Sequence, residues 1–150
     1  MILDKLDKDI LKALLKDSRT SFEEIARHHI VSGGTIHVRV NKMKEAGIIQ
    51  GSKIIVDAQK LGFGVCCYIG INLLSARDSS KVTKLLEKLP EVVECHYTTG
   101  QYSLFVKIMV EDTRALHIFL AEQLQSIPQI QSTDTLISLD CPIQRDISVE

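Results

Sequence analysis

Residues 21–47, SFEEIARHHIVSGGTIHVRVNKMKEAG, contain two short amphipathic segments separated by a tight turn. Ser21, followed three residues later by Glu24, forms a capping box, which predicts that a helix begins there. Ser32 offers a second helix cap soon after the first apolar stripe ends. Gly47 stands where a left-handed residue would end the second helix. The spacing therefore predicts a helix-turn-helix over about residues 21–47.

The predicted second helix has one apolar stripe and one exposed face. Ile36, Val40 and Met43 fall at i, i+4 and i+7, the spacing of a single helix face. In a helix-turn-helix the second helix enters the major groove, with its N-terminal residues against base edges. Double-stranded DNA is therefore the first partner to consider.

The residues expected to contact DNA lie at the start and on the outer face of this helix. They are Ser32, Gly34, Thr35, His37, Val38, Arg39 and Lys42. A hydroxyl group can bond a base edge, a valine can pack on a thymine methyl group, and an arginine can pair with guanine. Thr35, Val38 and Arg39 are therefore predicted to contact bases, whereas Lys42 suits a phosphate. The alternative is that these residues only solvate the outer face of an amphipathic helix.

The segments on either side complete the predicted domain. Residues 48–57, IIQGSKIIVD, suggest a β-hairpin whose two-residue turn begins at Gly51, the position of a wing. Lys53 at the tip could reach a phosphate, although a lone lysine in a turn is more often only solvated. Upstream, LDKDILKALLKDSRTS at 6–21 has the apolar spacing of a first helix. Residues 1–60 are therefore predicted to form a winged helix-turn-helix domain.

The remainder, residues 61–150, alternates between strand and helix patterns. The predicted strands are 65–74, 92–99, 102–110 and 130–140, and the predicted helices are 79–90 and 112–128. The order βαββαβ predicts a ferredoxin-like sandwich, with both helices on one face of an antiparallel sheet, so the whole chain is of the α+β class. The other sheet face needs a cover, for which a second copy of the chain is the simplest candidate.

Composition supports two domains. The first 60 residues contain eleven basic and eight acidic residues and the rest seven and eleven, so the net charge of -1 divides into +3 and -4. This modest basic excess lies where DNA would bind and suggests that tight binding needs a dimer. The four cysteines form no C-x-x-C pair, which argues against a metal site or a disulfide framework. Without a leader or a long apolar run, we expect a cytoplasmic chain that does not enter a membrane.

Three stretches resemble the Lrp/AsnC family of bacterial and archaeal regulators. They are GTIHVRVNKMKEAGII (34–49), YTTGQYSLFVKIMV (97–110) and IQSTDTLI (130–137). The resemblance covers essentially the whole chain and is strongest to asparagine-responsive members. It implies a DNA-binding domain joined to an effector-binding and oligomerisation domain of the RAM/ACT type, with homodimers that assemble further, commonly to octamers. It also implies control of amino-acid metabolism genes, here of asparagine synthesis, with an amino-acid effector and no cofactor.

The chain departs from the family pattern in the turn and near the effector site. Where the family usually has a glycine before the serine cap and a proline just after it, this chain has Ile30 and Gly33. A β-branched residue disfavours positive φ, and glycine does not preset the first helical residue as proline would. We therefore expect Ile30→Gly and Gly33→Pro each to stabilise the domain. Ser103 replaces an acidic residue of many members, which could shift effector choice or leave an effector ammonium to Asp134.

An amino-acid effector presents a carboxylate, an ammonium and, for asparagine, an amide. The turn between the central strands offers accessible N–H groups and hydroxyls, and the start of the last strand offers acceptors. The predicted effector residues are Thr98, Thr99, Gly100, Gln101 and Tyr102, with Gln131, Ser132, Thr133 and Asp134. In relatives the two segments meet near the interface between dimers, which would couple effector binding to assembly. The alternative is that the turn residues are ordinary hairpin residues.

Two other functions fit parts of the pattern. Some proteins of this architecture resemble haem-pathway decarboxylases, in which His96 or His117 would act as an acid or base. The sequence contains no paired carboxylates, nucleophile elbow or phosphate loop, and the basic second helix favours DNA. A helix-turn-helix that binds protein is the third possibility. The preferred prediction is a sequence-specific transcriptional regulator that is not an enzyme.

Overall fold

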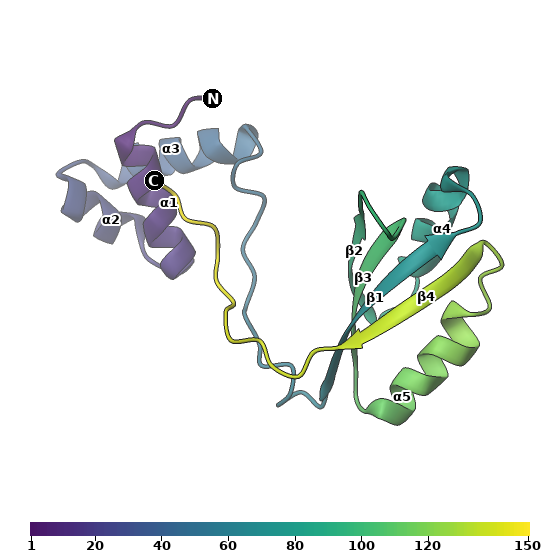
Figure 1. The fold of residues 1–150 in the computed structure, drawn as a ribbon. Coiled ribbons are helices and arrows are strands. Elements are labelled where there is room, and N and C mark those ends of the chain that lie inside the picture. The colour runs from purple at the N-terminus through teal and green to yellow at the C-terminus, as the bar shows by residue number, and fades with distance from the viewer. The chain divides into compact units, whose positions relative to one another are not determined.

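The computed structural model describes residues 1–150, which divide into two compact units. Met1–Ile55 and Ile143–Glu150 form the first unit, and Val56–Pro142 form the second. The C-terminal tail therefore groups with the N-terminal helices, which the sequence does not indicate. Figure 1 shows the helices of the first unit and the sheet of the second.

Three helices build the first unit: α1 (Lys5–Lys16), α2 (Phe22–His29) and α3 (Gly33–Glu45). They enclose a small core of buried side chains that come from all three helices. The core residues are Ile10, Ile25, Ala26, Ile36, Val40 and Met43. The apolar stripe predicted for the second helix of the motif is thus the buried stripe of α3.

The ends of α2 and α3 follow the predicted serine capping, but the second half of the capping box predicted at Ser21, a bond from its N–H to the Glu24 side chain, does not form. The hydroxyl oxygens of Ser21 and Ser32 each accept the backbone N–H group three residues further on. Gly47 has a φ of 72°, the left-handed conformation expected beyond the end of α3. Ile30 caps α2 with a φ of 55°, which strains a β-branched residue. The chain thus carries isoleucine at a position whose backbone favours glycine.

The hairpin predicted at 48–57 is wrong, because no strand lies between α3 and β1 (Val65–Leu73). The isoleucines of this segment occur as adjacent pairs, so a strand would direct one member of each pair to each face. Ile54 and Ile55 are 88% and 85% exposed, so the helices of the first unit do not cover them. A two-stranded hairpin without such a cover is marginal in water. Lys53 therefore lies in an irregular segment and not at the tip of a wing.

Four strands and two helices build the second unit in the predicted order βαββαβ. They are β1 (Val65–Leu73), α4 (Ser79–Leu86), β2 (Val92–Tyr97), β3 (Leu104–Val110), α5 (Thr113–Ile118) and β4 (Ile130–Ile137). The strands pair antiparallel in the order β2-β3-β1-β4, which is the ferredoxin-like arrangement. Both helices pack on the same face of the sheet (Figure 1). None of the helices has the length and apolar character that crossing a membrane requires.

Alternation along β1 defines the two faces of the sheet. Cys67, Ile69 and Ile71 are fully buried against the helices. Tyr68 and Asn72, at the intervening positions, belong to the opposite face, which we call the open face. One face of β1 is therefore buried against the helices, and no helix covers the open face.

The last helix is shorter than the predicted span of 112–128. It is α-helical over Thr113–Ile118 and continues as a π-helical segment, Phe119–Leu124. Near its end the Gln125 N–H donates to the Leu120 carbonyl, five residues back. The apolar pattern does not reveal this change, because the wider turn still directs bulky side chains toward the sheet.

Candidate nucleic-acid interface and effector site

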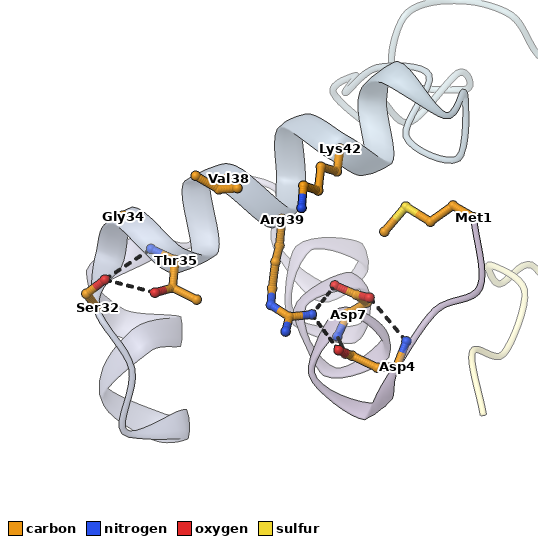
Figure 2. A pocket seen from close by; sticks show the side chains of 9 residues that line it. All are labelled: Met1, Asp4, Asp7, Ser32, Gly34, Thr35, Val38, Arg39 and Lys42. Atoms are coloured by element: carbon orange, nitrogen blue, oxygen red, sulfur yellow. Dashed lines mark hydrogen bonds and ion pairs between the residues drawn. The ribbon is translucent and has the colours of Figure 1, made fainter.

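Six of the eight residues predicted to contact DNA line one pocket of the first unit. The pocket has a volume of about 650 Å³ and lies between α3 and the start of α1 (Figure 2). The predicted residues that line it are Ser32, Gly34, Thr35, Val38, Arg39 and Lys42. Met1, Asp4 and Asp7 complete the lining. The pattern on α3 could not indicate these three residues, because they come from a different part of the chain.

The first turn of α3 is held by its own cap. Ser32 Oγ accepts the Thr35 N–H at 3.1 Å and lies 2.9 Å from Thr35 Oγ1. The remaining N–H groups of a helix N-terminus carry partial positive charge and favour phosphate oxygens. This turn therefore combines two hydroxyl groups with an electrostatically favourable position for the DNA backbone.

Arg39 does not extend freely from α3, as its predicted role as a base contact assumes. Its Nη1 donates to Asp4 Oδ2 and to Asp7 Oδ1, both at 2.7 Å (Figure 2). The hydrogen bonds to Asp7 and then Asp4 raise the pKa of the Arg39 guanidinium. The Asp7 backbone N–H and then Arg39 hold the pKa of Asp4 below its ordinary value. The structure thus engages this guanidinium with the carboxylates of Asp4, the N-cap of α1, and of Asp7 in its first turn.

The other predicted DNA contacts differ in their surroundings. Val38 is 52% exposed, and Lys42 is exposed and forms no ion pair. His37 packs edge-on against Phe22 of α2, with ring centroids 5.9 Å apart. His37 and Lys53 are the two predicted contacts that do not line the pocket. Val38 and Lys42 are therefore the predicted side chains that are least engaged within the chain.

The two segments predicted to bind an effector lie at the same end of the sheet. Ile71, near the end of β1, pairs with Leu104 at the start of β3 and with Thr133 near the start of β4. The turn that precedes β3 and the first residues of β4 therefore flank the end of β1. Their separation in the sequence hides this proximity, which follows from the strand order.

Hydrogen bonds within the chain hold the turn between β2 and β3. Thr98 Oγ1 donates to the Tyr102 carbonyl at 2.9 Å, and the Ser103 N–H donates to the Ile71 carbonyl at 2.9 Å. Gly100 has a φ of 102°, which favours glycine. The hydroxyl proton of Thr98 is therefore used inside the turn, whereas the neighbouring residues up to 101 are exposed.

Tyr102 connects this turn to the last strand. Its ring lies against Gly70, whose register partners are Phe105 and Asp134. A Cβ atom at Gly70 would lie 2.6 Å from two ring carbons of Tyr102, so the ring needs glycine there. Burial and a hydrogen bond with Asp134 raise the pKa of the Tyr102 hydroxyl. Gly70 is absent from the predicted set, because a strand glycine signals a close approach without identifying what approaches.

Asn72 is a second residue that the sequence pattern does not indicate. Its Nδ2 donates to Ser132 Oγ at 3.3 Å, across β1 and β4. A register shift at the end of β1 leaves Gln131 without a paired residue. Ser132 shares the open face with Asn72, whereas the next residue, Thr133, belongs to the other face. The predicted set is thus divided between the two faces of the sheet.

An aromatic strip runs across the open face from the turn. The Tyr102 and Phe105 rings stack with centroids 6.0 Å apart, and those of Phe105 and Tyr68 stack at 5.9 Å. Lys107 Nζ lies 6.0 Å from the centroid of the Tyr68 ring. Large aromatic side chains on an uncovered sheet face are typical of protein interfaces.

The two histidines considered for an enzyme do not share a site. His96 lies on β2, with Nε2 3.4 Å from Glu94 Oε2. His117 is exposed on α5, which packs on the other face of the sheet. Hydrogen bonds from His96 and then from Lys107 lower the pKa of Glu94, so His96 belongs to a hydrogen-bonded cluster around the Lys107–Glu94 ion pair on the open face.

A helix-turn-helix unit joined to a ferredoxin-like unit with a polar end site defines a class of DNA-binding transcriptional regulators. Residues 3–50 match the family model described as winged helix-turn-helix DNA-binding. Residues 66–147 match the model described as the Lrp/AsnC ligand binding domain. The chain belongs to the Lrp/AsnC family of transcriptional regulators.

Individual relatives agree with this assignment over nearly the whole chain. The chain is 55% identical to the Regulatory protein AsnC of Haemophilus influenzae over 145 residues, which cover 97% of each chain. The solved structure of Escherichia coli AsnC matches with a TM-score of 0.95 and 49% identity, covering 99% of each chain. A Neisseria meningitidis regulator solved as an L-Met complex has a TM-score of 0.91 at 23% identity, covering 99% of this chain and 97% of its own, and shares the fold.

Proposed function

We propose that this regulator binds specific duplex DNA through the outer face of α3. Thr35 and Val38 would contact base edges, and Lys42 would contact a phosphate. The exposure of Val38 and Lys42 and the place of all three residues in one pocket support these roles, although Thr35 itself is half-buried. The first turn of α3 and the irregular segment after it would approach the DNA backbone. The residues proposed for that approach are Ser32, Gly34, His37 and Lys53.

The functional unit proposed for DNA binding is a homodimer that assembles further, with an octamer as the expected form. The aromatic strip on the open face supports this proposal, because those rings have no cover within the chain. A dimer would place two recognition helices about one DNA turn apart over a pseudo-palindromic site. It would also double the modest positive charge that the first unit brings to DNA.

The proposed effector is an amino acid, with asparagine as the first candidate. Exposed Thr99 and Gln101 with Gly100 would bind its carboxylate, and Asp134 beside Tyr102 would receive its ammonium. Gln131, Ser132 and Thr133 would complete the site and contact the amide, and the Thr98 hydroxyl would hold the turn. An effector at this end of the sheet, beside the aromatic strip, would change the assembly if it binds two assembly states unequally.

The observation that carries the proposal is the 50–55% sequence identity, over nearly the full chain, to proteins named Regulatory protein AsnC. From it we infer that the targets are amino-acid metabolism genes, among them those for asparagine synthesis, and that the protein acts on chromosomal DNA in the cytoplasm. Regulation by binding, without catalysis, is the mode that this kinship favours.

Three measurements on the full-length protein test the proposal. Gel shifts with genomic fragments should give selective binding that weakens as salt increases. Calorimetry with the twenty amino acids should single out asparagine, and light scattering should report a change in assembly when it is added. Asp134→Asn should abolish the heat of binding, whereas Asp146→Asn in the C-terminal tail should leave it unchanged. Absence of DNA binding at low salt would refute the DNA-binding role, and absence of heat with every amino acid would refute the effector site.

A further inference from the structure

Arg39 of α3 bonds to both carboxylates of the capping box that begins α1. The Asp7 N–H donates to Asp4 Oδ1 at 2.9 Å, and the Asp4 N–H donates to Asp7 Oδ2 at 3.1 Å. The second oxygen of each carboxylate accepts a hydrogen bond from Arg39 Nη1. Figure 2 shows the Arg39 side chain running from α3 to these two carboxylates. One guanidinium group therefore joins the start of α1 to the middle of the recognition helix.

Asp7 requires this partner because it is buried. Its side chain is 5% exposed, and Asp7 is the charged residue within the buried set of the chain. A buried carboxylate is strongly unfavourable unless a cation or several donors compensate its charge. The cation that contacts it is Arg39, whose side chain is 29% exposed. Withdrawal of Arg39 toward DNA would leave the Asp7 carboxylate without its cation.

Base reading through Nη1 of Arg39 is therefore incompatible with its place in the fold. An arginine that recognises guanine presents a fork of two N–H donors to O6 and N7. In this chain both N–H groups of Nη1 donate to carboxylates, which leaves Nε and Nη2, and a DNA strand that approached these two groups would also approach Asp4, which lines the same pocket. The cluster of one guanidinium and two carboxylates has a net negative charge, which repels phosphate.

The small core makes such a contact important for the orientation of α3. Six buried apolar residues hold the three helices together, and all four cysteines lie outside the first unit. Apolar contacts of this kind tolerate small shifts, whereas two charged hydrogen bonds to fixed carboxylates define one position. Arg39 and Asp7 therefore set how α3 is held against α1.

We propose that Arg39 is a positioning residue of the DNA-binding surface and takes no part in base recognition. It holds α3 against the first turn of α1, so that Thr35 and Val38 present a fixed surface to the major groove. This inference rests on the proposed DNA-binding function. It predicts that loss of Arg39 weakens binding to all sequences by a similar factor, because every contact of α3 depends on the same orientation.

The test combines thermal unfolding with DNA binding by the full-length protein. The probes are a duplex selected from genomic fragments by the wild type and a shuffled duplex of the same composition. Arg39→Ala should lower the melting temperature and weaken binding to both duplexes, while their affinity ratio stays within about threefold of the wild-type ratio. Arg39→Ala combined with Asp7→Asn should recover part of the melting temperature and part of the affinity, because the buried charge is gone. Arg27→Ala, which removes an exposed arginine from α2, is the matched charge control.

Two results would overturn the inference. The first is a fall of about tenfold or more in the affinity ratio of Arg39→Ala with an unchanged melting temperature, which would make Arg39 a base contact. The second is the absence of any recovery in the double variant, including a double variant that fails to fold. If the wild type selects no duplex at all, the proposed function itself fails. Selection by the wild type together with either result above defeats only the positioning role of Arg39.

Discussion

Gly70→Ala tests whether the effector site depends on the packing of the Tyr102 ring against Gly70. The added Cβ would lie 2.6 Å from two carbons of the Tyr102 ring and 2.7 Å from a third. Carbon atoms in contact are about 3.5–4.0 Å apart, so the ring must move by about 1 Å. The strand backbone of β1 is paired on both sides, with β3 and β4, and cannot yield as the ring can. The expected movement is therefore of Tyr102, away from Asp134.

Two effects of different size follow from this displacement. Forcing an extra carbon into a packed position lowers the free energy of unfolding by about 1–3 kcal/mol. The second unit should therefore melt several degrees lower, since about 1 kcal/mol corresponds to roughly 4–8 °C in a unit of this size. Affinity for the amino-acid effector should fall by about tenfold, the equivalent of one well-placed hydrogen bond.

A ligand-independent measurement reports the displacement directly. The pKa of Tyr102 is raised above its ordinary value of 10.0 by burial and by Asp134. In Gly70→Ala it should return toward that value, so the hydroxyl ionises at lower pH in an ultraviolet titration, with Tyr102→Phe identifying its share of the signal. Gly51→Ala, where a Cβ meets no atom within 4 Å, is the matched control and should change neither quantity. Wild-type titration and wild-type effector affinity in Gly70→Ala would refute the reasoning.

Further predictions concern the first unit. Ile30→Gly should raise its melting temperature by several degrees, because a 95% exposed side chain is lost and the strain at a φ of 55° is relieved by about 1 kcal/mol; an unchanged or lower value in thermal unfolding would contradict this. Gly33→Pro should stabilise by about 0.4–1 kcal/mol, since the residue before it is extended and a Cβ meets only Glu23, 3.5 Å away. The pKa of Asp4 is lower in the folded protein than its ordinary value of 3.8, so ionised Asp4 stabilises the fold at pH values above 3.8. This stability is lost as the pH falls through the pKa that Asp4 has in the folded protein. Asp4→Asn should therefore melt lower than the wild type near pH 6, with a difference that shrinks below pH 4; a pH-independent difference would argue against the ion pair. Lys42→Ala should reduce the slope of log affinity against log salt by about 1, with the same loss on every duplex, and a change in selectivity would instead assign Lys42 to bases.

The sequence predicts the second unit well, because its elements are determined by local patterns. The strand predicted at 65–74 appears as Val65–Leu73, with one face buried against the helices and one open face on which Tyr102 covers Gly70. The helix that follows and the three later strands appear in the predicted order. In this unit the sequence does not predict that Phe119–Leu124 is π-helical. An α-helix and a π-helix would bury the same apolar residues here, so the apolar pattern does not distinguish them. Side-chain periodicity therefore defines which face is buried but not the exact turn of the backbone.

In the first unit the sequence predicts the caps but not the hairpin. Ser32 and Gly47 have the predicted geometry because capping and left-handed residues act within a few positions along the chain. A hairpin at 48–57 would need a surface to cover it, and the local pattern does not report whether one exists. The exposure of Ile54 and Ile55 is the consequence of that missing surface.

The candidate sites show a second limit, which concerns partners that lie far apart in the sequence. Helical projection places Val38 on the outer face of α3 and Arg39 about 60° from Ile36, beside the buried stripe. It does not reveal that Arg39 meets two carboxylates 32 and 35 residues earlier. The need for glycine at position 70 also comes from a distant residue, because the ring that lies against it belongs to Tyr102, in the turn before β3. A projection identifies the residues that could reach a ligand, whereas the fold decides which of them are already engaged within the chain. In this regulator Arg39, the strongest guanine ligand on α3, is engaged within the chain and is not part of the proposed reading surface. Its sequence preference should therefore depend on DNA shape and on methyl contacts at Thr35 and Val38 more than on arginine–guanine pairs.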